Sequence, residues 1–283
     1  MRKPIPFWKV FFSLVISVSL IFSLFNLSVS KEISKIRVIA TTSILSSAID
    51  ALGRGKVQIV TIMPPDSCPG HFDIRPGDVR NVSQAEVLFW HGFEKFVEEL
   101  VRSGREKILR IETMGTEKSI IIPEYYGECL QRIAQTLCEL IPEDREYFRG
   151  NLSVHRRELE VLTEKIKEEA IKKEVANINV ACSRHLKGLL EWVGFNVVVW
   201  YGFSEEITLR EMVQLVKESK EKNVKLVVDN LQSGRKLGIP ICQETGSQHL
   251  VLSFFPLKND YLNYLEENAE KLFGVIENVR NSN

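Results

Sequence analysis

The sequence predicts an α/β protein of two lobes, each with a mainly parallel sheet flanked by helices, joined by one long rigid helix with a cleft between the lobes. Three observations support this prediction. Short apolar runs alternate with amphipathic helical segments from residue 35 to residue 140. About thirty residues of strongly helical composition follow, and the alternation then restarts at residue 178. Strands that alternate with helices favour parallel sheets, whose carboxyl ends collect ligands.

The first lobe is predicted to span residues 31–141. Its strands are expected at residues 36–43, 57–64 and 87–92, and its helices at 43–53, 75–85, 94–104 and 124–140. Gly53 ends the first of these helices, and Pro142 breaks the chain after the last. The apolar segment "SIIIP" precedes the last helix.

The connecting helix is predicted over residues 142–175. Leu152, Leu159, Leu162 and Ile166 form a narrow apolar stripe, and most other positions are Glu, Lys or Arg. A long charged helix in mid-chain is suited to act as a rigid connector between lobes.

The second lobe is predicted over residues 176–283. Its strands are expected at 178–183, 195–202, 224–230 and 248–255, and its helices at 184–194, 209–223, 233–246 and 259–279. Pro240 interrupts the third of these helices.

The N-terminal 30 residues differ from the rest of the chain. Arg2, Lys3 and Lys9 precede an uncharged apolar stretch, Val10 to Ser30, which ends in small residues. This pattern is typical of a secretory signal peptide, although the stretch is also long enough for an uncleaved membrane anchor. Either alternative places the rest of the chain outside the cytoplasm, in the periplasm or at the cell surface.

Composition excludes some classes of function. Lys plus Arg and Asp plus Glu both number 37, so the chain lacks the basic excess of a nucleic-acid-binding protein. Five cysteines cannot all pair in disulfides, and Cys129 and Cys138 lie on opposite sides of a predicted helix. The chain contains no Ser-His-Asp order, P-loop or Gly-rich dinucleotide turn.

The spacing C-x-x-H occurs twice, once in each predicted lobe. Cys68 and His71 flank a Pro-Gly turn after one strand, and Cys182 and His185 follow another, where a helix N-terminus would favour a thiolate at Cys182. Two thiolates and two imidazoles suit zinc and also attract copper(I). The alternatives are inert buried residues or a Cys68–Cys182 disulfide.

Other polar residues are weaker candidates. Asp229 ends a strongly apolar strand, where an acid is often functional. His91 also ends a strand, but we expect a packing or supporting role for it. His155 lies on the charged connector and is expected to be solvated.

The sequence resembles the zinc- and manganese-binding solute-binding proteins of ABC importers. The resemblance covers nearly all residues after the N-terminal segment. It depends most on Gly70-His71 with Pro76, on Gly92-Phe93-Glu94 and on Glu244-Thr245-Gly246. It implies two α/β lobes joined by a long helix, with a metal held between them and delivered to a membrane permease.

The ligand positions that the resemblance implies are only partly retained. His71 matches the first histidine ligand, whereas Lys118 stands near the second and Ser183 at the third, between Cys182 and His185. Asp229 matches a Glu, and Ser253 stands near an Asp. We therefore expect a remodelled site of His71, Cys68, Cys182 and His185, with Asp229 nearby.

The predicted function is that of an extracytoplasmic, non-enzymatic substrate-binding subunit of an ABC transporter. The expected substrate is Zn2+, with Cu+, Mn2+ and Fe2+ as alternatives, and the expected partner is a membrane permease; the chain is expected to be a monomer. The alternatives are a binding protein for a metal chelate or tetrapyrrole on the same frame, and a zinc-dependent enzyme or chelatase.

Overall fold

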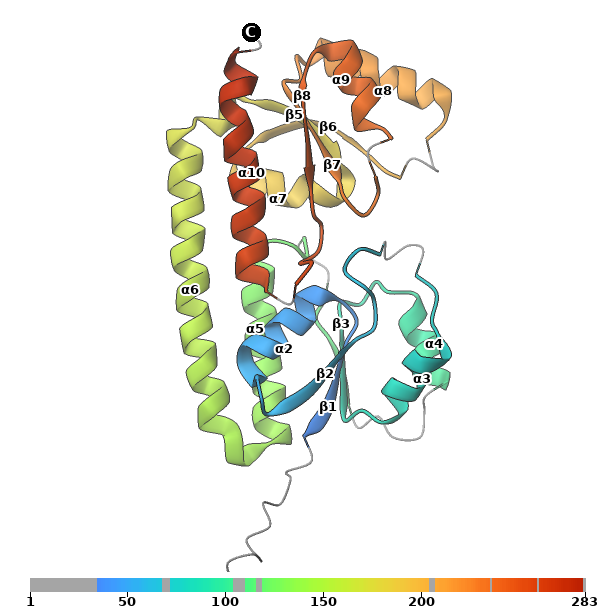
Figure 1. The fold of residues 1–283 in the computed structure, drawn as a ribbon, viewed down its shortest axis with the longest axis vertical. Coiled ribbons are helices and arrows are strands. Elements are labelled where there is room, and N and C mark those ends of the chain that lie inside the picture. Colours follow the sequence, from blue (N-terminus) through green and yellow to red (C-terminus); the bar gives the residue numbers. More distant parts are fainter. Residues whose placement is uncertain are drawn as a thin grey trace, which may run out of the picture. The chain divides into compact units, whose positions relative to one another are not determined.

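Two four-stranded parallel sheets, flanked by helices, organise the protein (Figure 1). The structure is a computed structural model that describes residues 35–67, 72–103, 110–115, 119–203, 207–234, 236–258 and 260–281. From Ile36 onward the chain forms one compact unit. We call the first sheet with α2–α5 the first lobe, and the second sheet with α7–α10 the second lobe. The predicted fold class of two parallel sheets flanked by helices, with one long helix, is confirmed.

The first sheet has the strand order β2-β1-β3-β4. Its strands are β1 (Ile36–Ala40), β2 (Val57–Thr61), β3 (Val87–Trp90) and β4 (Arg110–Thr113). Central strand β1 pairs in parallel with both neighbours, so that Val38 lies between Ile59 and Val87. Edge strand β4 was not predicted, because its sequence "RIET" holds one large apolar side chain and Ile111 is 44% exposed.

The second sheet has the order β6-β5-β7-β8. Its strands are β5 (Asn179–Ser183), β6 (Asn196–Tyr201), β7 (Leu226–Asn230) and β8 (Gln248–Leu252). All five residues of β7 are buried, as expected for a central strand covered by helices on both faces. The four strands lie where the sequence predicts them.

Helices cover both sheets. The α-helices are α2 (Ser43–Gly53), α3 (Pro76–Ser83), α4 (Phe96–Ser103), α5 (Pro123–Leu140), α6 (Arg145–Lys172), α7 (Lys187–Val193), α8 (Leu209–Glu221), α9 (Gly238–Thr245) and α10 (Tyr261–Asn281). Short 3-10 helices are η2 (Pro142–Asp144), η3 (Val175–Asn177) and η4 (Arg184–Leu186). Thr42 caps α2, and Thr208 caps α8 in a capping box with Glu211. Pro240 lies within the first turn of α9, where its missing N–H removes no helical hydrogen bond.

Helix α6 is the long helix that the sequence predicts, with 28 residues. It packs on α2 and α5 of the first lobe and on α7 and α10 of the second, and Figure 1 shows it running beside α5 and α10. Phe148, Leu159 and Ile166 are buried against these neighbours, while the rest of the helix is largely charged. The narrow apolar stripe therefore suffices to attach one helix to both lobes.

The hydrophobic core is continuous between the lobes. One cluster contains Val38 of the first sheet and Val228 of the second. Tyr261 of α10 stacks on Tyr126 of α5 at 3.9 Å between ring centroids, and its hydroxyl donates to the carbonyl of Ile121 at 2.9 Å. These contacts join the C-terminal helix to the first lobe.

No helix in the described ranges is both long enough and apolar enough to cross a membrane. The predicted signal peptide or anchor at residues 1–30 lies outside the described residues.

Candidate functional site

The carboxyl ends of β5, β6 and β7 meet at one edge of the second sheet. Ser183, Tyr201 and Asp229 come from these three strands and line a small polar cavity together with Ser233, Lys236 and Leu237. The Ser183 hydroxyl is buried and makes no hydrogen bond within the described residues. Ser183 precedes η4, as expected for an N-cap, but its side chain does not cap the helix.

Asp229 is held tightly at this edge. Its side chain accepts hydrogen bonds from the Tyr201 hydroxyl and from Nε2 of His249, each at 2.8 Å, and the residue is 1% exposed. Burial first, and then the Asp229 charge, raise the pKa of Tyr201 well above its usual value. A Cβ at Gly238 would lie 2.2 Å from Oδ2 of Asp229, so only glycine leaves room for this carboxylate.

Cys182 is a free thiol in the hydrophobic core. The residue is 0% exposed and belongs to the same apolar cluster as Leu186 and Leu190. Burial is the main cause that raises the pKa of this thiol to about 12. Burial thus disfavours the thiolate that the sequence predicts at Cys182, and the segment after β5 is a 3-10 helix of only three residues.

Cys182 and Asp229 lie on opposite faces of the sheet. Cys182 is the register partner of Val228 on β7, and both side chains face the core shared with the first lobe. Because side chains alternate along a strand, Asp229 points to the other face, where Ala181 and Val227 lie. The sheet therefore separates these two predicted site residues.

His185 lies in η4, immediately after β5, and is half-buried. Its ring contacts Phe203, which follows β6, and Phe254, which follows β8, with centroid distances of 5.0 and 5.2 Å. His185 is thus at the same sheet edge as the residue after β8. The structure describes three of the predicted site residues: Cys182, His185 and Asp229. Among these three, only His185 contacts both the segment that follows β6 and the segment that follows β8.

Cys68 and His71 lie outside the described residues, and so does Lys118. Within the parts of the chain that the structure describes, no three His, Cys, Asp or Glu side chains gather in a geometry that could hold a metal ion. The assignment of the five predicted site residues to a metal therefore stays a prediction.

The edge of the first sheet is organised by Glu94, which is 1% exposed. Its carboxylate accepts hydrogen bonds from the backbone N–H groups of His91, Gly92 and Phe93 and from the Thr41 hydroxyl. Gly92 has φ +112°, which favours glycine. The Gly92-Phe93-Glu94 motif thus closes the turn after β3.

His91 is buried beside this turn. Its ring nitrogens pair with the Thr42 hydroxyl at 2.8 Å and the Tyr125 hydroxyl at 2.5 Å, and burial lowers its pKa to about 4. These contacts confirm the expected packing role.

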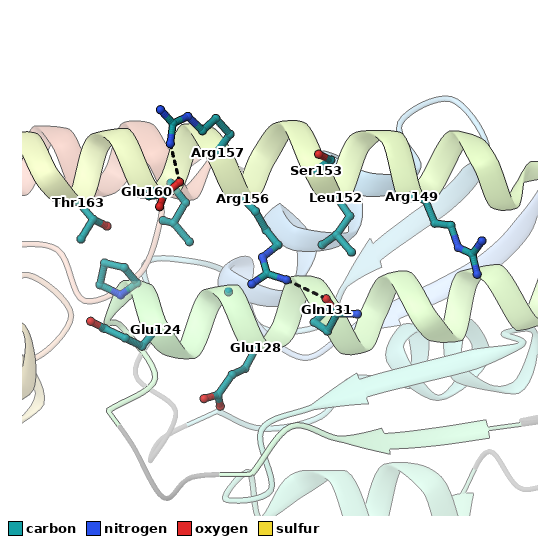
Figure 2. Close-up of a pocket in the computed structure, with 13 residues that line it drawn as sticks. Glu124, Glu128, Gln131, Arg149, Leu152, Ser153, Arg156, Arg157, Glu160 and Thr163 are labelled. Atoms are coloured by element: carbon teal, nitrogen blue, oxygen red, sulfur yellow. Dashed lines mark hydrogen bonds and ion pairs between the residues drawn. The ribbon is translucent and has the colours of Figure 1, made fainter.

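A large groove lies elsewhere, between α5 and α6 (Figure 2). Arg156 of α6 crosses it to donate to Gln131 of α5 at 3.1 Å, and Arg157 pairs with Glu160 at 2.7 Å. The groove contains none of the predicted ligands. Its lining includes three arginines and three glutamates, so these charges balance.

Several residues that shape the candidate site were not among the site residues predicted from the sequence. Tyr201, Gly238 and His249 hold Asp229, and Gln232 connects the segments that follow β2 and β8. Tyr201 and Gln232 lie at or just after the end of a predicted strand, whereas Gly238 opens α9 and His249 lies near the start of β8, where the sequence carries no such signal.

The fold and the sequence are similar to those of known metal-transport proteins. SsaB of Streptococcus sanguinis, a metal ABC transporter substrate-binding lipoprotein, is 23% identical over 164 residues, which cover 50% of this chain and 53% of SsaB. The chain thus spans about half the length of the first curated relatives that it matches. The structure of TroA, a periplasmic zinc-binding protein from Treponema pallidum, has a TM-score of 0.75 at 14% identity and covers 86% of this chain and 99% of TroA. FpvC from Pseudomonas aeruginosa in complex with Mn2+ has a TM-score of 0.77 at 16% identity, with coverages of 87% and 99%.

The family comparison covers most of the chain. Residues 38–274 match the family described as ZnuA, zinc-uptake complex component A, periplasmic. This range includes both sheets, the long helix and most of α10. The chain therefore belongs to the ZnuA family of metal ABC transporter substrate-binding proteins.

Proposed function

We propose that this chain is the extracytoplasmic subunit of an ABC importer that binds a transition metal and delivers it to a membrane permease. The observation that carries the proposal is the family match over residues 38–274. The relative SsaB is a lipoprotein with this kind of function, which supports a location outside the cytoplasm. The proposed role needs no bond-making chemistry, only a site whose affinity and accessibility suit capture and release.

The proposed site lies where the segment after β2 meets the carboxyl edge of the second sheet. Pro65, shortly before Cys68 and His71, accepts a hydrogen bond from the second lobe, and His185 lies at that edge. We propose His71, Cys68 and His185 as the core of the ligand set.

Cys182 and Asp229 have different places in this proposal. Cys182 faces the core, so it would have to turn toward the sheet edge to bind the ion. Asp229 already accepts two hydrogen bonds, which support a role as an anchor of the strand ends.

Zinc is the substrate that this ligand set favours. Thiolate and imidazole donors suit Zn2+, whereas Mn2+ prefers oxygen ligands. TroA is a zinc-binding protein and FpvC has been seen with Mn2+, so similar folds accept either metal. Both proposed ligand types must lose protons to bind, so zinc affinity should weaken as the pH falls from 7 to 5.

Native mass spectrometry of the reduced chain, equilibrated with Zn2+, tests the proposal. We expect one ion per chain for the wild type, and loss of stoichiometric binding in His71→Ala and His185→Ala. His155→Ala is the matched control, because His155 pairs with Glu158 on the connector helix. Cys182→Ser separates the two roles of that residue: retained binding assigns it to the core. An unchanged ion count in the His71→Ala/His185→Ala double variant would refute the proposed site.

A further inference from the structure

Gln232 follows β7 and joins three segments of the chain with its side-chain amide. Nε2 donates to the carbonyl of Pro65 at 2.8 Å and to the Ser253 hydroxyl at 3.1 Å. Oε1 accepts from the backbone N–H of Phe254 at 3.0 Å. Both amide donors and the amide oxygen are thus engaged. We call this set of three hydrogen bonds the Gln232 bridge.

Hydrogen bonds from neighbouring residues hold the turn that carries Gln232. The side chain of Asn230 accepts from the N–H of Gln232 at 3.2 Å and donates to the Ser233 hydroxyl at 2.9 Å. Leu231 donates its N–H to the carbonyl of Leu252 at 2.8 Å, which continues the pairing of β7 with β8. The backbone of the turn that carries the Gln232 side chain is therefore fixed by hydrogen bonds.

The second-lobe partner of Gln232 is equally fixed. The Ser253 hydroxyl donates to the carbonyl of Phe255 at 2.6 Å, and the side chain of Asn268 on α10 pairs with both the N–H and the carbonyl of Ser253. The only bond of the bridge that reaches the first lobe is the one to Pro65.

Pro65 belongs to the segment that leaves β2. The N–H of Met63 donates to the carbonyl of Thr41, and that of Ser67 to the carbonyl of Pro64, which shape this segment up to residue 67. Pro65 lies three residues before Cys68 and six before His71. The bond at Pro65 therefore ties the described end of this segment, residues 62–67, to the second lobe.

We propose that Gln232 is a positioning residue for metal binding: its bond to Pro65 holds the segment that leaves β2, described up to Ser67, against the second lobe, and Cys68 is the next residue in the sequence. The inference rests on the proposed function and names a residue that does not contact the metal. Loss of the bond leaves a partly buried amide or carbonyl without its partner. Zinc binding weakens to the extent that the metal-bound chain depends on this bond more than the free chain does, and the full value of one such bond corresponds to roughly tenfold.

Two variants separate the parts of the bridge. Gln232→Glu keeps the shape and the acceptor for Phe254 but replaces the nitrogen that donates to Pro65 and Ser253 by a carboxylate oxygen, which repels the Pro65 carbonyl. Gln232→Ala removes all three bonds. Gln243→Ala is the matched control, because Gln243 is an exposed glutamine on α9 of the same lobe.

The measurements are hydrogen exchange of residues 57–67 in the full chain, zinc affinity, and the visible absorption spectrum of the Co2+-substituted protein. We expect faster exchange at Asp66 and Ser67, about tenfold weaker zinc binding and a shifted Co2+ spectrum in both Gln232 variants, with Gln243→Ala like the wild type. A merely structural role would lower thermal stability without moving the Co2+ spectrum. Wild-type exchange and spectra in Gln232→Glu would overturn the inference.

The two proposals fail differently. If the wild type binds no metal, the proposed function is refuted, and the positioning role with it, whereas the exchange data still show whether the bridge holds the segment after β2. If the wild type binds metal and the Gln232 variants bind it equally well, only the positioning role is refuted.

Discussion

Replacing Asp229 with alanine should destabilise the second lobe strongly, because two donors lose the acceptor that they share. Tyr201 is 4% exposed, so its hydroxyl would be left buried without a partner. His249 has a side chain that is 23% exposed and can hydrate after the change. The two losses are therefore unequal.

The size of the effect follows from these exposures. A hydrogen bond to a charged group contributes about 1.5–3 kcal/mol. We take the upper part of that range for Tyr201 and the lower part for His249, which gives a loss of about 4 kcal/mol. This is a large share of the roughly 5–15 kcal/mol that stabilises a typical protein.

Urea denaturation of the metal-free chain, followed by circular dichroism, measures this loss. Tyr201→Phe should cost about two thirds as much as Asp229→Ala, and the double variant should cost little more than Asp229→Ala alone, because both changes remove the same bond. Asp229→Asn should retain zinc binding if Asp229 is an anchor. A loss below 1 kcal/mol in Asp229→Ala, or additive losses in the double variant, would refute the reasoning.

Three further predictions follow from buried groups and close contacts. Burial lowers the pKa of His91 to about 4 in the folded state, so the unfolded chain takes up this proton at a higher pH than the folded chain does. Folding stability should therefore decrease as the pH is lowered from about 6.5 to 4. In urea titrations the stability advantage of the wild type over His91→Gln should shrink by roughly 3 kcal/mol across that window, and a constant difference would contradict this. Gly188→Ala should lower the free energy of unfolding by about 1–3 kcal/mol, because the added Cβ would lie 2.4 Å from the Cβ of Ser119. The control Gly150→Ala on α6 adds a Cβ that meets no other atom and should raise the free energy of unfolding by about 0.5–1 kcal/mol. Equal effects of the two variants in thermal unfolding would count against the predicted clash with Ser119. Cys182 should not react with a thiol reagent at pH 8 in the folded chain, because it is buried and burial raises its pKa. Cys182→Ser should therefore lower the number of cysteines that the reagent modifies only after unfolding. A lower number in the folded chain would show that the Cys182 thiol is accessible.

Much of the fold could be predicted because the strands of a parallel sheet are continuous apolar runs. The segment "LVVDN" is buried along its whole length, and its apolar residues Leu226, Val227 and Val228 predict a buried strand. Strand β4 lacks that signal, because an edge strand packs only part of its surface and can be polar. The long helix was predictable from its charge and its narrow apolar stripe.

The candidate site was less predictable. When both faces of a strand are buried, its sequence does not show on which face of the sheet each side chain lies. The C-x-x-H spacing treats Cys182 and His185 as a pair, yet Cys182 faces the core and His185 lies beyond the strand. The Gln232 bridge depends on the approach of two segments that are 167 residues apart. No local pattern in the sequence reports such a contact.

Zinc K-edge X-ray absorption of the reduced chain loaded with one Zn2+ tests the central claim most directly, since it reports both retention of the metal and the elements that bind it. The account predicts a sulfur shell at about 2.3 Å, lost in Cys68→Ser, together with nitrogen at about 2.0 Å, reduced in His71→Ala. A chain that retains no zinc, or a first shell of oxygen alone, would contradict it.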